Sequence, residues 1–170
     1  MTMINTKEAK SIYTPDNKAQ EAVWLHGCNV DQVSMIEDLI QNKPEAEICC
    51  SKPNDKGCGT PFQLMGLYIK GEVTLMSRTD IGSKYDLVSG ERSFRGSIST
   101  EDADKIFVKN YEDLSVITEG HGYTEAFVKP RQILGVWVCG FAYNKDDMRA
   151  KILKKKCEKL IARGYSIEVI

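Results

Sequence analysis

His26 and Gly27 are the first residues of this chain whose types and placing could serve chemistry. They follow the apolar run of residues 23–25 and precede a helix that the pattern predicts to begin after Asn29. Groups at the end of a strand, next to a turn, are often ligand-binding groups because a rigid scaffold holds them in place. The sequence therefore predicts a binding position at His26 and Gly27.

Two further segments carry a ring and a carboxylate. Tyr68 ends the motif Gly-Leu-Tyr, and Glu125 ends the motif Tyr-Thr-Glu, which opens a strand-like run. A tyrosine ring can stack on a flat aromatic group. A single carboxylate can stabilise positive charge that develops on a sugar ring as a glycosidic bond breaks. Only the order of these segments after His26 and Gly27, described next, makes Tyr68 and Glu125 candidate site residues.

The order His-Gly, Gly-x-Tyr and Glu resembles the ADP-ribosyltransferase superfamily, in the branch of diphtheria toxin and the poly(ADP-ribose) polymerases. Tyr68 follows His26 by 42 residues, Glu125 follows Tyr68 by 57 residues, and the resemblance extends over roughly residues 22–140. Cys28 stands where this branch usually has Ser or Thr. Tyr85 is the candidate for the second stacking tyrosine of the family.

The resemblance implies an enzyme that transfers one ADP-ribose unit from NAD, its co-substrate, and releases nicotinamide without a metal. Glu125 would be the catalytic residue. The residues implied to bind NAD are His26 (adenosine ribose), Gly27 (nicotinamide amide), Tyr68 (nicotinamide ring) and Tyr85 (second stacking ring).

The acceptor implied by the resemblance is a macromolecule. Arginine-modifying relatives usually carry a carboxylate or an amide two positions before the catalytic Glu, where this chain has Tyr123. The expected acceptor is therefore a protein side chain other than arginine, with nucleic acid as a second kind of acceptor. Many stand-alone transferases of this size are bacterial toxins or effectors, so a host protein is one such target, reached by a specialised secretion route.

Composition describes an ordinary globular protein. The chain has 170 residues, 42% hydrophobic content and a formal net charge of -1. This length fits one domain, and the charge gives no global electrostatic case for nucleic acid or a membrane. The polar N-terminus lacks a signal-peptide core, and no run reaches the ~20 apolar residues of a membrane span. A cytoplasmic protein that does not contact membranes, with free cysteines, is expected.

The pattern along the chain predicts an α+β domain at residues 21–170, preceded by a weakly ordered polar arm at residues 1–20. Periodic apolar residues predict a helix after Asn29, with Gln32 as its capping partner. Residues 64–69 and 73–76 read as two strands. A last helix is expected between Asn144 and Gly164, with Met148, Ile152, Leu153, Cys157, Leu160 and Ile161 on its apolar face. The resemblance implies a single domain with split, roughly perpendicular antiparallel sheets and flanking helices.

Two other functions remain open from the residues alone. One is a cysteine-dependent hydrolase that uses Cys28 or Cys58 with His121 as its base. The other is a non-catalytic binding module that uses a basic C-terminal helix, because residues 141–170 hold eight Lys and Arg against four acidic residues. A metal site at Cys49, Cys50 and Cys58 is disfavoured because adjacent cysteines lack the usual ligand spacing.

Overall fold

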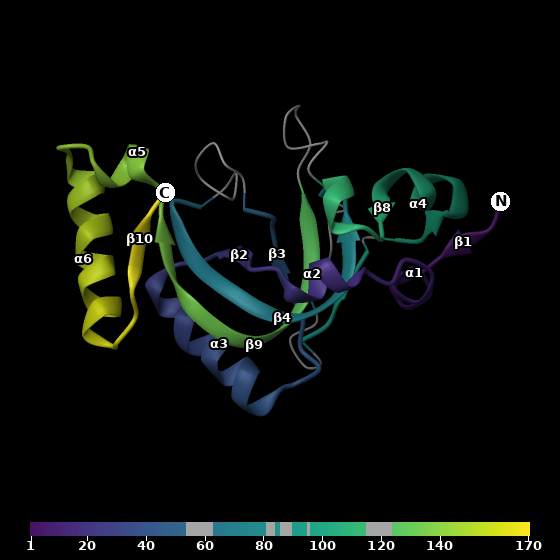
Figure 1. The fold of residues 1–170 in the computed structure, drawn as a ribbon, viewed down its shortest axis with the longest axis horizontal. Coiled ribbons are helices and arrows are strands. Elements are labelled where there is room, and N and C mark those ends of the chain that lie inside the picture. The colour runs from purple at the N-terminus through teal and green to yellow at the C-terminus, as the bar shows by residue number, and fades with distance from the viewer. Residues whose placement is uncertain (54–62, 81–83, 86–89, 95, 115–123) are drawn as a thin grey trace.

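The computed structural model describes residues 1–53, 63–80, 84–85, 90–94, 96–114 and 124–170, and it has the expected α+β fold (Figure 1). The helices are α1 (Thr6–Ile12), α2 (Asn17–Glu21), α3 (Val30–Asn42), α4 (Thr100–Ile106), the 3₁₀ helix η1 (Tyr111–Leu114), α5 (Gly140–Tyr143) and α6 (Met148–Ala162). The strands are β1 (Met3–Ile4), β2 (Trp24–Gly27), β3 (Ile48–Cys50), β4 (Met65–Ser77), β5 (Lys84–Tyr85), β6 (Arg92–Ser93), β7 (Ile98–Ser99), β8 (Phe107–Val108), β9 (Glu125–Val138) and β10 (Ile167–Val169).

Two long antiparallel strands, β4 and β9, form the centre of the main sheet and pair along their whole length. Strand β2 pairs with the first half of β4, whereas β3 pairs with the first half of β9. Strands β8 and β10 complete this six-stranded sheet, and β1–β7 and β5–β6 form two small antiparallel ribbons. Figure 1 shows β4 and β9 bending together into a deep curve.

Strand β4 differs from the sequence prediction, which placed two separate strands at residues 64–69 and 73–76. The chain continues as one strand through Gly71, with shifts of register on both sides of it. A Cβ atom at Gly71 would lie 2.1 Å from the carbonyl oxygen of Lys129. Only glycine permits this close approach. Gly71 therefore marks a bend within β4 and not a turn between two strands.

The curve formed by β4 and β9 brings β2 close to β3. His26 of β2 pairs with Leu67 of β4, which in turn pairs with Val136 of β9. Cys49 of β3 pairs with Phe127, which lies nine residues before Val136 on β9. Nevertheless Leu25 and Ser51 exchange two backbone hydrogen bonds of 2.9 and 2.8 Å. The sheet therefore closes into a ring of strands in the order β2, β4, β9 and β3, with Ser51 after β3 completing the ring.

Helix α3 packs against β9 of this sheet, and α6 packs against α3 and α5. The backbone N–H of Asn29 donates to the side chain of Gln32 at 2.9 Å, which confirms the predicted cap of α3. Helix α6 begins after Asp147, whose carboxylate accepts a hydrogen bond from the N–H of Ala150, so the predicted cap at Asn144 is wrong. Gly164 ends α6 with a φ of 93°, as predicted.

The apolar face of α6 was only partly predicted. The side chains that it buries are Ala150, Leu153, Cys157 and Leu160. Met148, Ile152 and Ile161, which the prediction assigned to the same face, are 69%, 50% and 56% exposed. Leu153, Cys157 and Leu160 belong to both the predicted and the observed face, and Ala150 was not predicted.

Residues 1–20 form helices α1 and α2 packed on the sheet instead of the weakly ordered arm that their polarity suggested. Asn5 and Glu8 form a reciprocal capping box at the start of α1. Ala9 and Tyr13 are buried, and the Tyr13 ring lies 5.2 Å from that of Phe107. A few apolar side chains therefore suffice to hold this segment. In the described part of the chain, every helix is too short or too polar to cross a bilayer.

Candidate functional site

His26 lies in β2 beside the end of β3. Its Nδ1 atom is 2.6 Å from the backbone carbonyl oxygen of Cys49. A carbonyl oxygen only accepts, so Nδ1 carries the proton and donates it to this bond. In the neutral imidazole, Nε2 then keeps a free lone pair that can accept a hydrogen bond from a hydroxyl group.

The surroundings of His26 favour this neutral form. Burial lowers the pKa of His26, the hydrogen bond to the Cys49 carbonyl opposes that effect, and the positive charge of Arg92 lowers the pKa further. Desolvation disfavours a charged imidazolium, and a nearby guanidinium repels it. His26 is thus suited to accept a hydrogen bond from a ligand at neutral pH.

Glu125 is the first residue of β9, where its backbone pairs with Ser77 of β4. Only 3% of Glu125 is exposed, which is unusual for a glutamate. The Sγ atom of Cys49 donates a hydrogen bond to Oε1 of Glu125 over 2.7 Å. The fold therefore buries this carboxylate and holds it in place, and its catalytic role stays a prediction.

Burial raises the pKa of Glu125 to about 7. The thiol of Cys49 and the charge of Arg92 act in the opposite direction, whereas the charge of Asp80 and a hydrogen bond with Asp80 raise the pKa. At neutral pH the protonated and ionised forms of Glu125 coexist. A carboxyl group with such a pKa can both give and take a proton, and a group perturbed by burial together with specific charges is a candidate for function.

Cys49 connects the two predicted residues. Its carbonyl oxygen accepts from His26 and its thiol donates to Glu125, so one residue of β3 touches both. Sequence reasoning treated Cys49 only as a disfavoured metal ligand. The missing signal is the curvature of the sheet, which places β3 between β2 and the start of β9.

Two charged residues near Glu125 were also missed. Asp80 lies just after β4 and is exposed, and Arg92 lies in β6. Asp80 supplies a second carboxylate next to Glu125. The sequence motif holds no such group, because Tyr123 stands two residues before Glu125. The expectation that the acceptor is a side chain other than arginine, which rests on Tyr123, stays a prediction.

Gly27 and Tyr85 lie close to this group through their strands. Gly27 follows His26 and pairs with Gly66 of β4. The backbone of Tyr85 in β5 pairs with that of Arg92, the residue whose charge acts on both His26 and Glu125. The folded chain therefore gathers the segments of four predicted residues: Glu125, His26, Gly27 and Tyr85.

Tyr68 lies elsewhere. It pairs with Leu25, whereas its neighbour Leu67 pairs with His26, so the Tyr68 ring projects from the opposite side of the sheet. Burial and the carboxylate of Glu168 in β10, with which the phenol forms a hydrogen bond, raise the pKa of Tyr68 to about 12. Tyr68 lines a separate cavity of about 620 Å³ with Ser166 and Glu168. The structure does not bring the Tyr68 ring to His26 and Glu125.

The cysteine-hydrolase alternative receives no support from Cys28. Its thiol is only 1% exposed, and burial raises its pKa to about 12, so the reactive thiolate is strongly disfavoured. Cys58 and His121 lie outside the described residues. Among the described cysteines, Cys28, Cys49, Cys50 and Cys157 are free thiols, whereas Cys139 is disulfide-bonded, so the prediction of free cysteines is wrong at that position.

We find no candidate metal site in the part of the chain that the structure describes. Groups of three or more His, Cys, Asp or Glu side chains arranged to hold an ion do not occur among the described residues. The adjacent thiols of Cys49 and Cys50 lie on a strand, where neighbouring side chains point to opposite faces.

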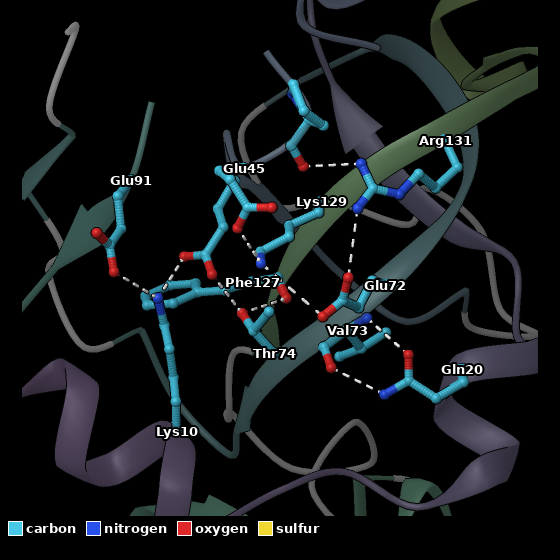
Figure 2. A network of polar contacts seen from close by, with 12 residues as sticks. Lys10, Gln20, Glu45, Glu72, Val73, Thr74, Glu91, Phe127, Lys129 and Arg131 are labelled. Atoms are coloured by element: carbon cyan, nitrogen blue, oxygen red, sulfur yellow. Dashed lines mark hydrogen bonds and ion pairs between the residues drawn. The ribbon is translucent and has the colours of Figure 1, made fainter. Parts of the chain in front are cut away.

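A polar cavity of about 410 Å³ lies between α1 and the strands β4 and β9. Figure 2 shows the network of polar contacts among the residues there. The Lys10 ammonium contacts the buried carboxylate of Glu47 at 2.7 Å, and the Thr74 hydroxyl donates to the same carboxylate at 2.7 Å. Lys129 pairs with Glu45 at 2.7 Å. Because these charged groups are paired within the protein, we interpret the network as a structural clamp, which stabilises the fold and does not bind a ligand.

No protein-family model, no curated protein sequence and no solved structure matches this chain. Function is therefore inferred from the residues and their arrangement. Within the described residues, the most favourable site is the group formed by His26, Cys49, Asp80, Arg92 and Glu125, which we call the Glu125 site.

Proposed function

We propose that the protein is an ADP-ribosyltransferase that cleaves NAD at the Glu125 site and transfers one ADP-ribose unit to a macromolecular acceptor. The observation that carries this proposal is the convergence of His26 and Glu125 on Cys49, since the two residues are 99 positions apart in the sequence. Both had been selected for this role from the order of the sequence motifs alone.

The arrangement of the strands also supports the proposal. The strand with His-Gly (β2), the strand with Gly-x-Tyr (β4) and the strand with the glutamate (β9) are consecutive neighbours in one sheet. Chance matches to three short motifs have no reason to fall on adjacent strands. The Tyr68 ring does not belong to the group, so stacking on nicotinamide falls to another residue, with Tyr85 as the candidate.

The chemistry assigned to the site needs few groups. The bond between the ribose anomeric carbon and the nicotinamide nitrogen breaks, and nicotinamide leaves with the bonding electron pair. Ionised Glu125 stabilises the positive charge that develops on the ribose. Neutral His26 accepts a hydrogen bond from a ribose hydroxyl through Nε2 and helps to orient the substrate.

The acceptor completes the reaction. Its nucleophilic atom forms a bond to the anomeric carbon and loses a proton. Asp80 is the group placed to receive that proton, because its exposed carboxylate lies next to the buried Glu125. The acceptor is a protein side chain in this proposal, and a guanidinium group is one of the nucleophiles that a pair of carboxylates can bind.

Release of nicotinamide tests the proposal. Wild-type protein and the Glu125→Gln variant are incubated with NAD, and the released nicotinamide is quantified. The control is Glu72→Gln, which neutralises an exposed carboxylate on the neighbouring strand β4. Loss of one preorganised electrostatic group commonly lowers the rate by about 10²- to 10³-fold. We expect this loss for Glu125→Gln and a rate near that of the wild type for Glu72→Gln. Equal rates in all three proteins, or no nicotinamide from the wild type, would remove the basis of the proposal.

A further inference from the structure

Helix α6 carries exposed apolar and basic side chains on the side that faces away from the sheet. Met148, Ile152, Lys155 and Lys159 follow one another at spacings of four, three and four residues, so they form one stripe along the helix. All four are exposed, and Met148 and Ile152 are 69% and 50% exposed. We call these four residues the outer stripe. Figure 1 shows α6 at one edge of the molecule, opposite the end that carries α1.

More cations flank the outer stripe. Arg149 and Lys156 lie on one side of it, and Lys151 lies on the other together with the acidic Glu158. Within the described residues, none of these cations and neither lysine of the stripe forms an ion pair. Unpaired cations on one face attract an anionic surface, and exposed aliphatic side chains among them gain free energy only where they leave water.

A small cavity adjoins the same face. It has a volume of about 240 Å³, and Arg149, Ile152 and Lys156 line it from α6. Asn29 and Gln63 supply polar groups on its other side. A phosphate group that approaches the stripe would therefore find two cations and amide groups beside an apolar side chain.

The charge of the chain is also divided between its parts. Residues 141–170 carry eight Lys and Arg and four Asp and Glu, a balance of +4, so the net charge of -1 leaves -5 for residues 1–140. A negatively charged surface therefore attracts the end with α6 and repels the remainder. This division orients the molecule with the outer stripe toward such a surface.

We propose that the outer stripe and its flanking cations dock the protein on an anionic lipid bilayer, with Met148 and Ile152 entering the headgroup region and the lysines contacting lipid phosphates. Amphipathic helices bind membrane surfaces by this combination of apolar burial and attraction to anionic lipids. The contact lies on the surface and needs no spanning segment, so this proposal departs from the expectation, drawn from the net charge and the lack of a spanning run, that the protein does not contact membranes. It is independent of the proposed reaction at the Glu125 site.

Two other partners fit the face less well. Protein interfaces are enriched in arginine and aromatic residues and depleted in lysine, whereas this face holds four lysines and one arginine. Single-stranded nucleic acid needs aromatic rings on which bases stack, and the outer stripe offers only aliphatic groups between its cations. Flexible lysines that reach headgroups while their stems cover apolar surface suit a bilayer.

Co-sedimentation with vesicles tests this inference on the full chain. The wild type is expected to bind vesicles of phosphatidylcholine with phosphatidylserine, to release as salt rises, and to bind pure phosphatidylcholine weakly. Lys155→Glu with Lys159→Glu is expected to weaken binding by about tenfold or more. Met148→Ser with Ile152→Ser should weaken it severalfold at equal charge.

The control makes the same change of charge elsewhere. Lys7→Glu with Lys109→Glu alters exposed lysines outside α6 and should bind phosphatidylserine vesicles nearly as the wild type does. The proposal is overturned if the wild type does not bind these vesicles, or if both charge reversals weaken binding equally. Tighter binding to a single-stranded oligonucleotide than to the vesicles would also overturn it, in favour of nucleic acid.

Discussion

The thiol of Cys49 donates a hydrogen bond to Oε1 of Glu125 over 2.7 Å, while the carbonyl of the same cysteine accepts one from His26. Cys49 therefore holds a histidine and a glutamate that lie far apart in the sequence. A thiol that donates to a carboxylate favours the ionised form of that carboxylate. Here this effect opposes the rise in the pKa of Glu125 that burial causes.

A pH profile of nicotinamide release tests this relationship. If ionised Glu125 is needed, kcat/KM should rise with pH through the pKa of about 7 and level off above it. Cys49→Ala removes the hydrogen bond and should move this rise to higher pH, whereas Cys49→Ser keeps a donor and should restore the position of the curve. Identical profiles for the Ala variant and the wild type would show that the thiol does not act on Glu125.

The buried carboxyl group also makes stability depend on pH. The pKa of Glu125 is about 7 in the folded protein against 4.5 as its ordinary value, so between these values the folded state binds more protons than the unfolded state. This contribution to stability is complete below about pH 4.5 and is lost as pH rises through 7.

Glu125→Gln should therefore stabilise the protein at high pH, because glutamine keeps the shape but cannot ionise. At pH 8 we expect the free energy of unfolding of Glu125→Gln to exceed that of the wild type by about 3 kcal/mol, and at pH 4.5 the two should be close. Urea denaturation at both pH values measures this difference. A variant that is less stable than the wild type at pH 8 would contradict the assigned pKa.

The clamp around Glu47 gives a prediction about the fold alone. Lys10→Met leaves the buried Glu47 carboxylate without its cation, which typically costs about 3–5 kcal/mol. Lys105→Met removes an exposed pair with Glu101 on α4 and should cost less than about 1 kcal/mol. Thermal unfolding of the two variants compares them. Equal effects would mean that the Thr74 hydroxyl and solvent suffice for Glu47.

The sequence predicted the elements that depend on local pattern. Helix α3 begins where Asn29 and Gln32 form the predicted cap, and Gly164 ends α6 at a positive φ. His26 and Glu125 were also selected from short local motifs, His26 near the end of β2 and Glu125 at the start of β9, and their role as site residues stays a prediction. Such features depend on residues within a few positions of one another.

The remaining features depend on contacts between distant residues. Nothing near Gly71 distinguishes a turn from a bend, because the reason for the glycine is the Lys129 carbonyl on another strand. The same holds for Cys49, whose role follows from the closure of β2 onto β3. Met148 and Ile152 have the spacing of core residues, yet they are exposed, and only Leu153, Cys157 and Leu160 of the predicted face are buried.

The bend at Gly71 links the fold to the proposed reaction. A Cβ atom at this position would lie 2.1 Å from the Lys129 carbonyl oxygen and 2.8 Å from Val128, so Gly71→Ala must push β4 and β9 apart. Overpacking of this kind costs about 1–3 kcal/mol or more. The curve of β4 and β9 brings His26 to Cys49 and Glu125. In Gly71→Ala, nicotinamide release should therefore fall together with stability.

Gly96→Ala is the matched control, since a Cβ atom there meets nothing within 4 Å, and it should leave stability within about 0.5 kcal/mol of the wild type and the rate unchanged. Chemical denaturation and nicotinamide release, measured on both variants below their unfolding transitions, separate the two effects. If Gly71→Ala loses stability but keeps the full rate per folded molecule, the Glu125 site does not depend on the bend. A rate that falls below the folded fraction would show that the curvature of β4 and β9 sets the geometry of the site.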